Sequence, residues 1–219
     1  MLLLSLAGLT AIGIWIGREE IASNLIEDQL TQLGLPAEYE IVSIGPMRQV
    51  LRNISIGDPE FPDLIIEEIA VELEYGLGSP EITTVRVVRP RLFGTYRNGE
   101  LSFGALDPVL FAESEDPASL PDLNLTLIDG RAQIASDFGM IGLKAEGAGV
   151  LNDSFEGILA ASAPGITLAS CKADAATLYG GITTRRGYPR FEGPMRLRGI
   201  QCEDEGTVLR TADIGTDIT

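Results

Sequence analysis

The chain has 219 residues, and its 32 acidic against 16 basic side chains give a formal charge of −16 without a single histidine. This length suits one domain or two small ones, and a hydrophobic content of 45% supplies enough apolar surface for a folded core. The acidic excess would repel a phosphate backbone, which makes nucleic acid a poor partner. Without histidine, Ser/His/Asp and Cys/His catalytic systems and histidine metal sites are excluded.

Residues 1–17 carry no charged side chain and are predicted to form a transmembrane signal anchor, a helix with Leu2 at its start and Ile16 at its end. At ~1.5 Å per residue, this helix covers roughly 25 Å of a hydrocarbon core that is ~30 Å thick. A cleaved signal peptide and a buried core helix are the alternatives. Cleavage after Ala22 would place Glu20 where a small residue is required. We expect the chain that follows to lie outside the cytoplasm.

Residues 18–34 are predicted to form an amphipathic helix, which Gly34 and Pro36 bring to an end. Its polar face is acidic, whereas a helix that lies on anionic lipid normally carries Lys and Arg. Capping the end of a following sheet is therefore its expected role.

From residue 37 onward the dominant hydrophobic period is two, with turn residues about every ten positions, which is typical of antiparallel strands. An acidic, proline-bounded loop at residues 111–120 divides this region. The sequence therefore predicts a first β subdomain at 37–110 and a second at 121–219. Their Gly- and Ala-rich strands favour an elongated, curved antiparallel sheet with a thin core.

Local signals place turns and irregularities within the two subdomains. Val88 and Arg89 interrupt the alternation as a β-bulge would, and Asn98-Gly99 predicts a two-residue hairpin. Asp129-Gly130 predicts a second hairpin. Further strands are expected in the ranges 141–151, 155–162, 173–183 and 190–200. Residues 213–217 are expected to form a turn.

Cys171 and Cys202 are the only cysteines, too few for a zinc tetrad. Outside the cytoplasm they can pair, and a disulfide closing a loop of about 32 residues would contribute on the order of 3 to 4 kcal/mol. Two free buried thiols are the alternative.

No catalytic set, metal site or cofactor site is predicted. Four glutamates occupy nearly alternate strand positions, where a solvated face is the favoured interpretation over a carboxylate or cation site: Glu67, Glu68, Glu72 and Glu74. The sequence offers no spacing that demands an extracytoplasmic enzyme with paired carboxylates.

Arginines gather in two stretches of this acidic chain, at Arg86, Arg89, Arg91 and Arg97 and again at Arg185, Arg186, Arg190, Arg196 and Arg198. They could meet anionic lipid head groups. Cross-strand ion pairs with glutamates are the favoured alternative.

Several strings carry a family resemblance when they are taken together. They are VRVVRPRLFGTYRNGELSFGALDPVL at 85–110, PDLNLTLIDGRAQI at 121–134, GAGVLNDSFEGILAASAP at 147–164 and GPMRLRGIQC at 193–202. With the N-terminal anchor and capping helix, the chain resembles the N-terminal region of the YdbH branch of the AsmA-like family, which also includes TamB. The resemblance covers nearly the whole chain, and its motifs are structural patterns.

This resemblance implies a non-enzymatic protein of the inner membrane of a Gram-negative bacterium, single-pass, with its bulk in the periplasm. The family's curled sheet, the β-taco, carries phospholipid acyl chains along an apolar groove toward the outer membrane. An outer-membrane-associated protein is an expected partner. Members of this branch are several times longer, so we expect this chain to be the membrane-proximal portion of a longer protein.

Apolar residues at alternate strand positions are the candidates for the lipid groove: Ile69, Val71, Leu73, Val85, Val87, Leu123, Leu125 and Leu127. Packing of the same residues as an ordinary core is the alternative. A second hypothesis for function is a membrane-tethered assembly factor that binds outer-membrane or secreted proteins, for example by strand addition at an open sheet edge.

Overall fold

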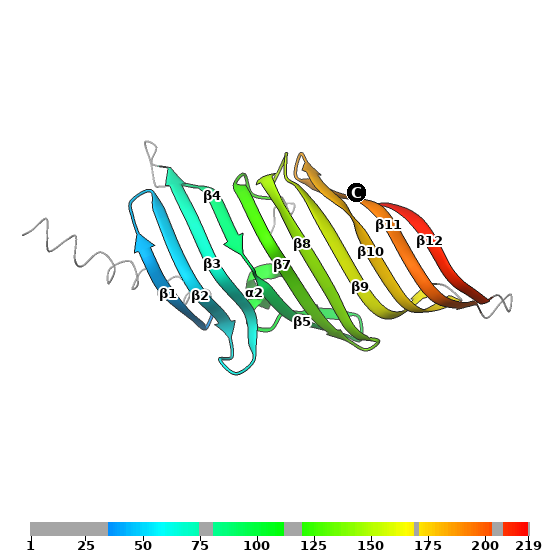
Figure 1. Cartoon of the computed structure of the whole chain (residues 1–219). Helices are drawn as coiled ribbons and strands as arrows, with labels where there is room; N and C mark the ends of the chain where they lie inside the picture. Colours follow the sequence, from blue (N-terminus) through cyan, green and yellow to red (C-terminus); the bar gives the residue numbers. More distant parts are fainter. Residues whose placement is uncertain (1–34, 75–80, 112–119, 169–170, 203–207, 219) are drawn as a thin grey trace, which may run out of the picture.

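The computed structural model of the protein describes residues 35–74, 81–111, 120–168, 171–202 and 208–218, which form one long mixed β-sheet (Figure 1). The predicted anchor at 1–17 and the predicted capping helix at 18–34 lie outside the described residues, as does most of the predicted acidic loop. Within the described ranges, no helix has the length and apolar character needed to cross a membrane.

The chain enters the sheet at β1 and leaves it at β12. The strands are β1 (Ala37–Ile44), β2 (Arg48–Gly57), β3 (Pro62–Glu74), β4 (Glu81–Val88), β5 (Arg91–Arg97), β6 (Glu100–Ser102), β7 (Asn124–Ser136), β8 (Gly139–Val150), β9 (Glu156–Leu168), β10 (Cys171–Arg185), β11 (Tyr188–Cys202) and β12 (Val208–Ile218). A 3₁₀ turn, η1 (Gly104–Leu106), and a single-turn helix, α2 (Asp107–Leu110), stand between β6 and β7.

The spatial order is β1-β2-β3-β4-β7-β8-β9-β10-β11-β12. β5 continues the line of β4 between β3 and β7, and both strands run parallel to β7 with the same register, from Thr84 opposite Asn124 to Tyr96 opposite Ser136. The prediction of an antiparallel sheet is therefore wrong at this junction. β7 starts beside β4, with Asn124 opposite Thr84, and runs in the same direction.

The Asn98-Gly99 hairpin is confirmed. Arg97 pairs with Glu100, and Asn98 and Gly99 have φ of 53° and 88°, as a type I′ turn requires. The predicted strands in the second half are also confirmed as β8 to β11, each extending beyond its predicted range at one end or both.

The predicted hairpin at Asp129-Gly130 is wrong, because β7 runs straight through it as one strand. Asp129 has a φ of 46°, but Gly130 does not adopt the positive φ that a type I′ turn also needs. The register between β7 and β8 shifts between Leu127 and Gly130, so the dipeptide forms a β-bulge.

The predicted turn at residues 213–217 is also wrong. These residues belong to β12, where Asp213 pairs with Arg196 and Asp217 with Glu192. Ion pairs from β11, Arg196 to Asp213 and Arg190 to Asp217, help to hold the strand in place.

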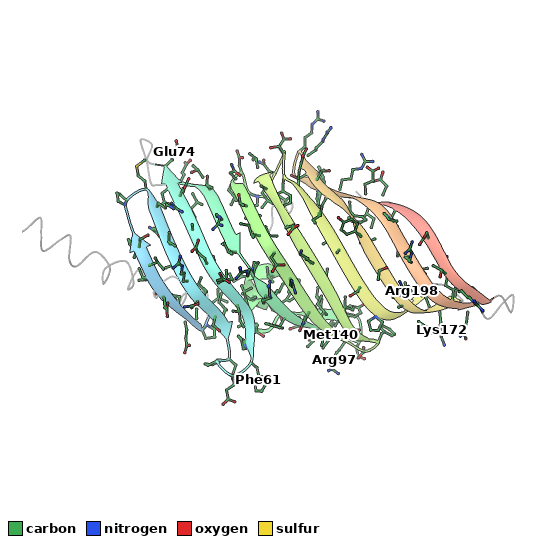
Figure 2. The ribbon with its side chains drawn as sticks, in the orientation of Figure 1. Phe61, Glu74, Arg97, Met140, Lys172 and Arg198 are labelled. Carbon is green, nitrogen blue, oxygen red and sulfur yellow. A yellow bond between two sulfur atoms is a disulfide. The ribbon has the colours of Figure 1, made fainter. Side chains whose placement is uncertain are left out.

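The core is thin, as predicted: no described side chain is less than 2% exposed. One cluster lies on β2 and β3 and consists of Leu35, Ile54, Ile56, Ile66 and Leu106. A second lies on β10 and β11 and consists of Ala173, Ala176, Leu197 and Ile200. Large apolar side chains stand in solvent at the strand ends, among them Phe61 and Met140 in Figure 2.

Candidate functional site

One face of the sheet is apolar across its whole width. Directly paired residues project from the same face, so the pairings can be followed from strand to strand. The first such line of residues, the Ile69 row, runs from β1 to β12 and contains Ile41, Leu51, Ile69, Val87, Leu127, Gly147, Gly157, Ile182, Phe191 and Ile218.

A second line, the Leu92 row, also crosses from β1 to β12, through β5. It contains Ala37, Ile56, Leu64, Leu92, Ala132, Leu143, Ala161, Leu178, Met195 and Ile214. Neither row contains a polar or charged residue. Members of both rows pack against the same buried cluster on β2 and β3, so the two rows share one face. We call the surface made by these two rows the apolar face. Nine interstrand steps of about 4.8 Å make it roughly 43 Å wide.

The opposite face of the same strands is polar. From β7 to β12 its matching line of paired residues is Gln133, Gly142, Ser162, Thr177, Arg196 and Asp213. The Arg196 guanidinium donates to the Asp213 carboxylate at 2.7 Å, and this hydrogen bond is the main cause of the lowered pKa of Asp213. Charge is thus concentrated on the face that meets water.

A line of three left-handed residues crosses the first half of the sheet and keeps the apolar face continuous there. We call this line the crease. Asn53, Arg89 and Asp129 have φ of 50°, 48° and 46°, and the flanking pairings align them across β2, the β4–β5 junction and β7. The predicted interruption of the alternation at Val88 and Arg89 is therefore present, but the predicted bulge is wrong, because no residue is inserted: Val88 pairs with Ile128 and Arg91 with Arg131 in one register. Apolar positions are odd-numbered on one side of the crease and even-numbered on the other, as with Val87 and Leu92, yet both pack on one cluster. If the alternation continued unbroken, the apolar side chains beyond the crease would project from the opposite face. The left-handed residues shift the alternation by one position and keep these side chains on the apolar face.

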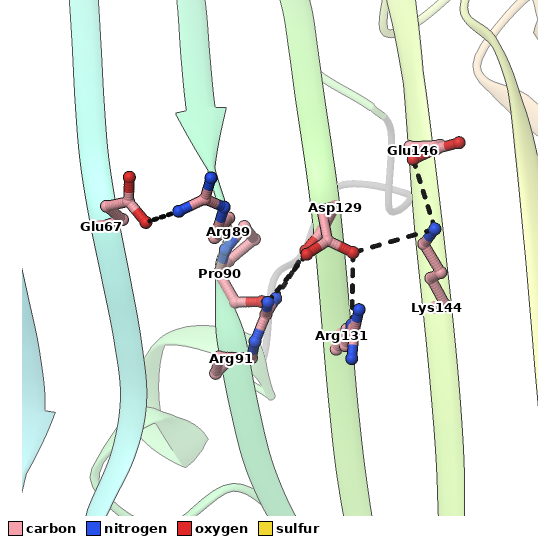
Figure 3. A network of polar contacts seen from close by, with 8 residues as sticks. All are labelled: Glu67, Arg89, Pro90, Arg91, Asp129, Arg131, Lys144 and Glu146. Carbon is pink, nitrogen blue, oxygen red and sulfur yellow. Dashed lines mark hydrogen bonds and ion pairs between the residues drawn. The ribbon is translucent and has the colours of Figure 1, made fainter.

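An ion-pair network spans this crease on the polar face (Figure 3). Asp129 accepts from Arg91 at 2.8 Å and from Arg131 at 3.2 Å, and Lys144 lies 3.8 Å away. The hydrogen bond from Arg91 is the main cause that holds the pKa of Asp129 below its ordinary value. Arg89 pairs with Glu67 in the same network. Ion pairs therefore link four neighbouring strands at the crease.

The predicted acidic row lies in β3. Glu67 and Glu68 are ion-paired, and Glu68 lies between Arg52 at 2.8 Å and Arg86 at 3.0 Å. The hydrogen bond from Arg52 lowers the pKa of Glu68. Within the described ranges, no group of His, Cys, Asp or Glu side chains is placed to hold a metal ion.

The structure brings most of the predicted groove residues together. Ile69, Val87 and Leu127 are consecutive members of the Ile69 row, and the next line of pairings joins Val71, Val85 and Leu125. Leu73 pairs with Ile82 one step further along, and the carbonyl of Leu123, just before β7, accepts from the amide of Leu151. All eight candidates are half-buried.

The sequence reasoning missed the continuation of this face through β8 to β12. There the row members include the small residues Gly147, Gly157 and Ala161 besides isolated large ones such as Leu143, Leu178 and Met195. The alternation of these small residues with polar ones was the available signal.

Two phenylalanine rings occupy the space that glycines without side chains leave on the apolar face. We call these spaces the glycine hollows. A Cβ on Gly147 would lie 2.6 Å from the ring of Phe155, and a Cβ on Gly180 would lie 2.7 Å from the ring of Phe191. Gly193, the partner of Gly180, meets the same Phe191 ring. Both phenylalanines are only 6% exposed although no described helix packs over them, because their rings lie against the backbone.

Part of the apolar face is covered by the chain itself. The segment from β6 to α2 places Leu106 in the cluster on β2 and β3, and Asp63 accepts the amide of Ala105 to hold it there. Asp107 accepts from Ser102 and the amide of Phe103, which fixes the turn. From β8 to β12 the described contacts are with neighbouring strands, so no described segment forms a second layer over this half of the face.

Cys171 and Cys202 stand directly opposite each other on β10 and β11, and the structure joins them in a disulfide. Both pack against the second cluster of the apolar face. The bond ties the two longest strands together at one end.

Residues 3–214 match the YdbH-like family, described as "Intermembrane phospholipid transport protein YdbH". No curated protein sequence matches the chain. The family match covers nearly the whole chain, including every strand of the sheet up to β12. The chain therefore belongs to the YdbH-like family of intermembrane phospholipid transport proteins, which are not enzymes.

Proposed function

We propose that this protein carries phospholipids between the inner and the outer membrane by holding their acyl chains on the apolar face of its sheet. Residues 1–17 anchor it in the inner membrane as a single span, and the sheet lies in the periplasm. Lipid moves from the inner toward the outer membrane, the direction that the family resemblance implies.

The observation that supports this proposal best is the unbroken apolar character of the Ile69 and Leu92 rows from β1 to β12. Each buried CH₂ group of an acyl chain is worth ~0.8 kcal/mol. A chain that moved along these rows would remain covered at each step, so its hydration would change little. No bond is made or broken, and no cofactor is needed.

The exposure of the apolar face also supports an apolar occupant. All eight groove candidates are half-buried, and no described part of the chain forms a second layer over the face from β8 to β12. Soluble monomers rarely leave contiguous apolar surface of this extent in water. An acyl chain would cover it.

The β6–α2 segment narrows the path at its start. Leu106 fills the apolar face beside Ile54 and Ile66, which leaves the side of Val71, Val85 and Leu125 for lipid. The disulfide between β10 and β11 suits the periplasm, an oxidising compartment.

Mass spectrometry of lipids that copurify with the detergent-solubilised protein tests the proposal. Wild-type protein should carry stoichiometric phospholipid, and the Val71→Asp and Leu125→Asp variants should lose it. Thr126→Asp is the matched control, because Thr126 pairs with Arg86 on the polar face of the same strand. Wild-type protein without phospholipid, or equal loss in Thr126→Asp, would reject the proposal.

A second candidate function rests on the sheet edges. In the described part of the chain, β1 pairs with β2 alone and β12 with β11 alone, so each presents unpaired backbone groups on its outer side. A membrane-tethered assembly factor would use such an edge to add a strand of an outer-membrane or secreted protein. It would then copurify with a polypeptide rather than with phospholipid.

A further inference from the structure

A hollow of about 700 Å³ lies on the polar face of β10 and β11, beside their connecting turn. Most of the residues that line it are opposite each other on the two strands: Gly181 and Glu192, Thr183 and Arg190, and Arg185 and Tyr188. Ile182 and Phe191 alternate with them and belong to the apolar face. The hollow is therefore separate from the surface on which we place lipid.

One lining residue is a glycine that the strand itself does not require. Gly181 pairs with Ile158 and with Glu192 without a shift in register, and its φ is not left-handed. A Cβ on Gly181 would meet no atom closer than 4.0 Å, whereas the rings of Phe155 and Phe191 occupy the glycine hollows of the apolar face. Glycine inside a regular strand weakens the strand and often marks a place where a ligand approaches the backbone. Gly181 thus keeps the hollow on the polar face open.

Hydrogen-bond donors and acceptors lie side by side around this hollow. The Nε of Arg190 donates to the Asp217 carboxylate of β12 at 2.9 Å. This hydrogen bond is the main cause that raises the pKa of Arg190, and the negative charge of Glu192 adds a smaller effect. Within the described ranges, Arg185 and Glu192 form no ion pair. Two guanidinium groups therefore share the site with two carboxylates, and their charges cancel.

This arrangement favours an uncharged ligand whose polar groups both donate and accept hydrogen bonds. Arginine can only donate and an ionised carboxylate can only accept, whereas a hydroxyl group does both. A phosphate would be repelled by the two carboxylates, and a cation would be repelled by the two arginines. The Tyr188 ring is 75% exposed beside the hollow and offers a flat apolar surface with a polar edge. Sugars combine a rim of hydroxyl groups with an apolar face of C–H groups, so they match this site.

We propose that the hollow binds an uncharged oligosaccharide, with the C–H face of one sugar ring against Tyr188 and its hydroxyl groups between Arg185 and Glu192. Its volume lies within the range of small-molecule sites, about 300 to 1,000 Å³. The inference goes beyond the proposed function, because the hollow and the apolar face lie on opposite sides of the same strands and can be occupied together. A bound glycan would hold the sheet in place while lipid moves along the other face.

Isothermal titration calorimetry of the whole detergent-purified chain tests the site with two uncharged tetrasaccharides. One is the tetramer of N-acetylglucosamine, a sugar of the bacterial cell wall, and the other is maltotetraose, which contains only glucose. At least one of them should bind. The tighter ligand distinguishes a cell-wall glycan from a glucose polysaccharide as the source.

Tyr188→Ala should lose roughly tenfold in affinity for the tighter sugar, as expected for one aromatic contact. Glu192→Gln should also bind this sugar more weakly, because a charged acceptor is lost. Both side chains are exposed, so both variants should unfold at the wild-type temperature. Tyr179→Ala is the matched control and should keep its affinity. Tyr179 lies on the same face of β10 and is 59% exposed, but it does not line the hollow.

Copurified phospholipid is measured in the same preparations, and saturating sugar should leave it in place. Binding of neither sugar, or an equal loss of affinity in Tyr179→Ala, would overturn this inference, and phospholipid in that preparation would leave the proposed function standing. Tighter binding of inorganic phosphate than of either sugar would reveal an anion site and would also overturn it. Displacement of phospholipid by sugar would place both ligands on one surface, with the same consequence. Sugar binding by protein that carries no phospholipid would support this inference and reject the proposed function.

Discussion

Arg91 donates to Asp129 at 2.8 Å across the junction at which β5 runs parallel to β7. The interaction links the two halves of the sheet at the crease that keeps the apolar face continuous. It lies on the polar face, so the charges of Arg91 and Asp129 are kept away from the proposed lipid path on the apolar face.

Asp129→Asn should lower the melting temperature at pH 7 and flatten its dependence on pH. The pKa of Asp129 is lowered in the folded protein, chiefly by the hydrogen bond from Arg91. Its stabilising effect is therefore complete above the ordinary aspartate pKa of about 3.9 and is lost as the pH falls through the lowered value. Thermal unfolding between pH 7 and pH 2 measures both effects. Glu68 and Asp213, whose pKa values are also lowered, leave a residual slope of the same sign. Identical pH profiles for variant and wild type would contradict this role of Asp129.

Phe191→Ala should destabilise the protein by about 3 kcal/mol, the loss typical of a buried phenylalanine. The ring is 6% exposed and covers Gly180 and Gly193, whose backbone the variant would open to water. Urea unfolding measures the change. Tyr179→Ala is the control on the other face of β10, where the side chain is 59% exposed and the expected change is within about 0.5 kcal/mol. Equal effects of the two substitutions would show that the ring does not stabilise the glycine hollow.

Reduction of the Cys171–Cys202 disulfide should lower the free energy of unfolding by about 3 to 4 kcal/mol. The bond closes a loop with a sequence separation of 31, and its loss releases that loop in the unfolded chain. Urea unfolding with and without reductant measures this, and the Cys171→Ser/Cys202→Ser variant should match the reduced wild type. An unchanged midpoint on reduction would mean that strand pairing alone sets the stability of β10 and β11.

Leu106→Ala should destabilise the first half of the sheet by about 3 kcal/mol. Leu106 is 7% exposed and packs with Ile54, Ile56 and Ile66, so its truncation leaves a cavity beneath the β6–α2 segment. Val109→Ala in the same segment is the control, because Val109 is 44% exposed. Hydrogen exchange should localise the loss to β2 and β3. Exchange that rises equally in β10 and β11 would contradict separate clusters.

The strands themselves could be predicted from the sequence because alternation is a local property. The alternation of residues such as Ile69, Val71 and Leu73 with polar ones indicates which side of their own strand is apolar. The Asn98-Gly99 turn was equally readable, since both of its positions need the left-handed conformation that these residues adopt easily.

The features that failed depend on partners distant in sequence. Asp-Gly is a hairpin signal, but at Asp129 the partners Arg91 and Lys144 come from other strands and stabilise a bulge instead. The strand at residues 213–217 is weak by composition and is held by Arg190 and Arg196 of β11. The full width of the apolar face could not be predicted for the same reason, because the rows exist only once the register of every strand is set.

Photocrosslinking along β10 tests whether phospholipid lies on only one face of the sheet. A benzophenone-bearing phenylalanine would replace Leu178 or Ile182, which lie on the apolar face, and Tyr179 or Thr183, which lie on the polar face. We expect crosslinks to copurified phospholipid at Leu178 and Ile182 and none at Tyr179 and Thr183. Equal yields from both faces, or no lipid adduct at any of the four positions, would contradict it.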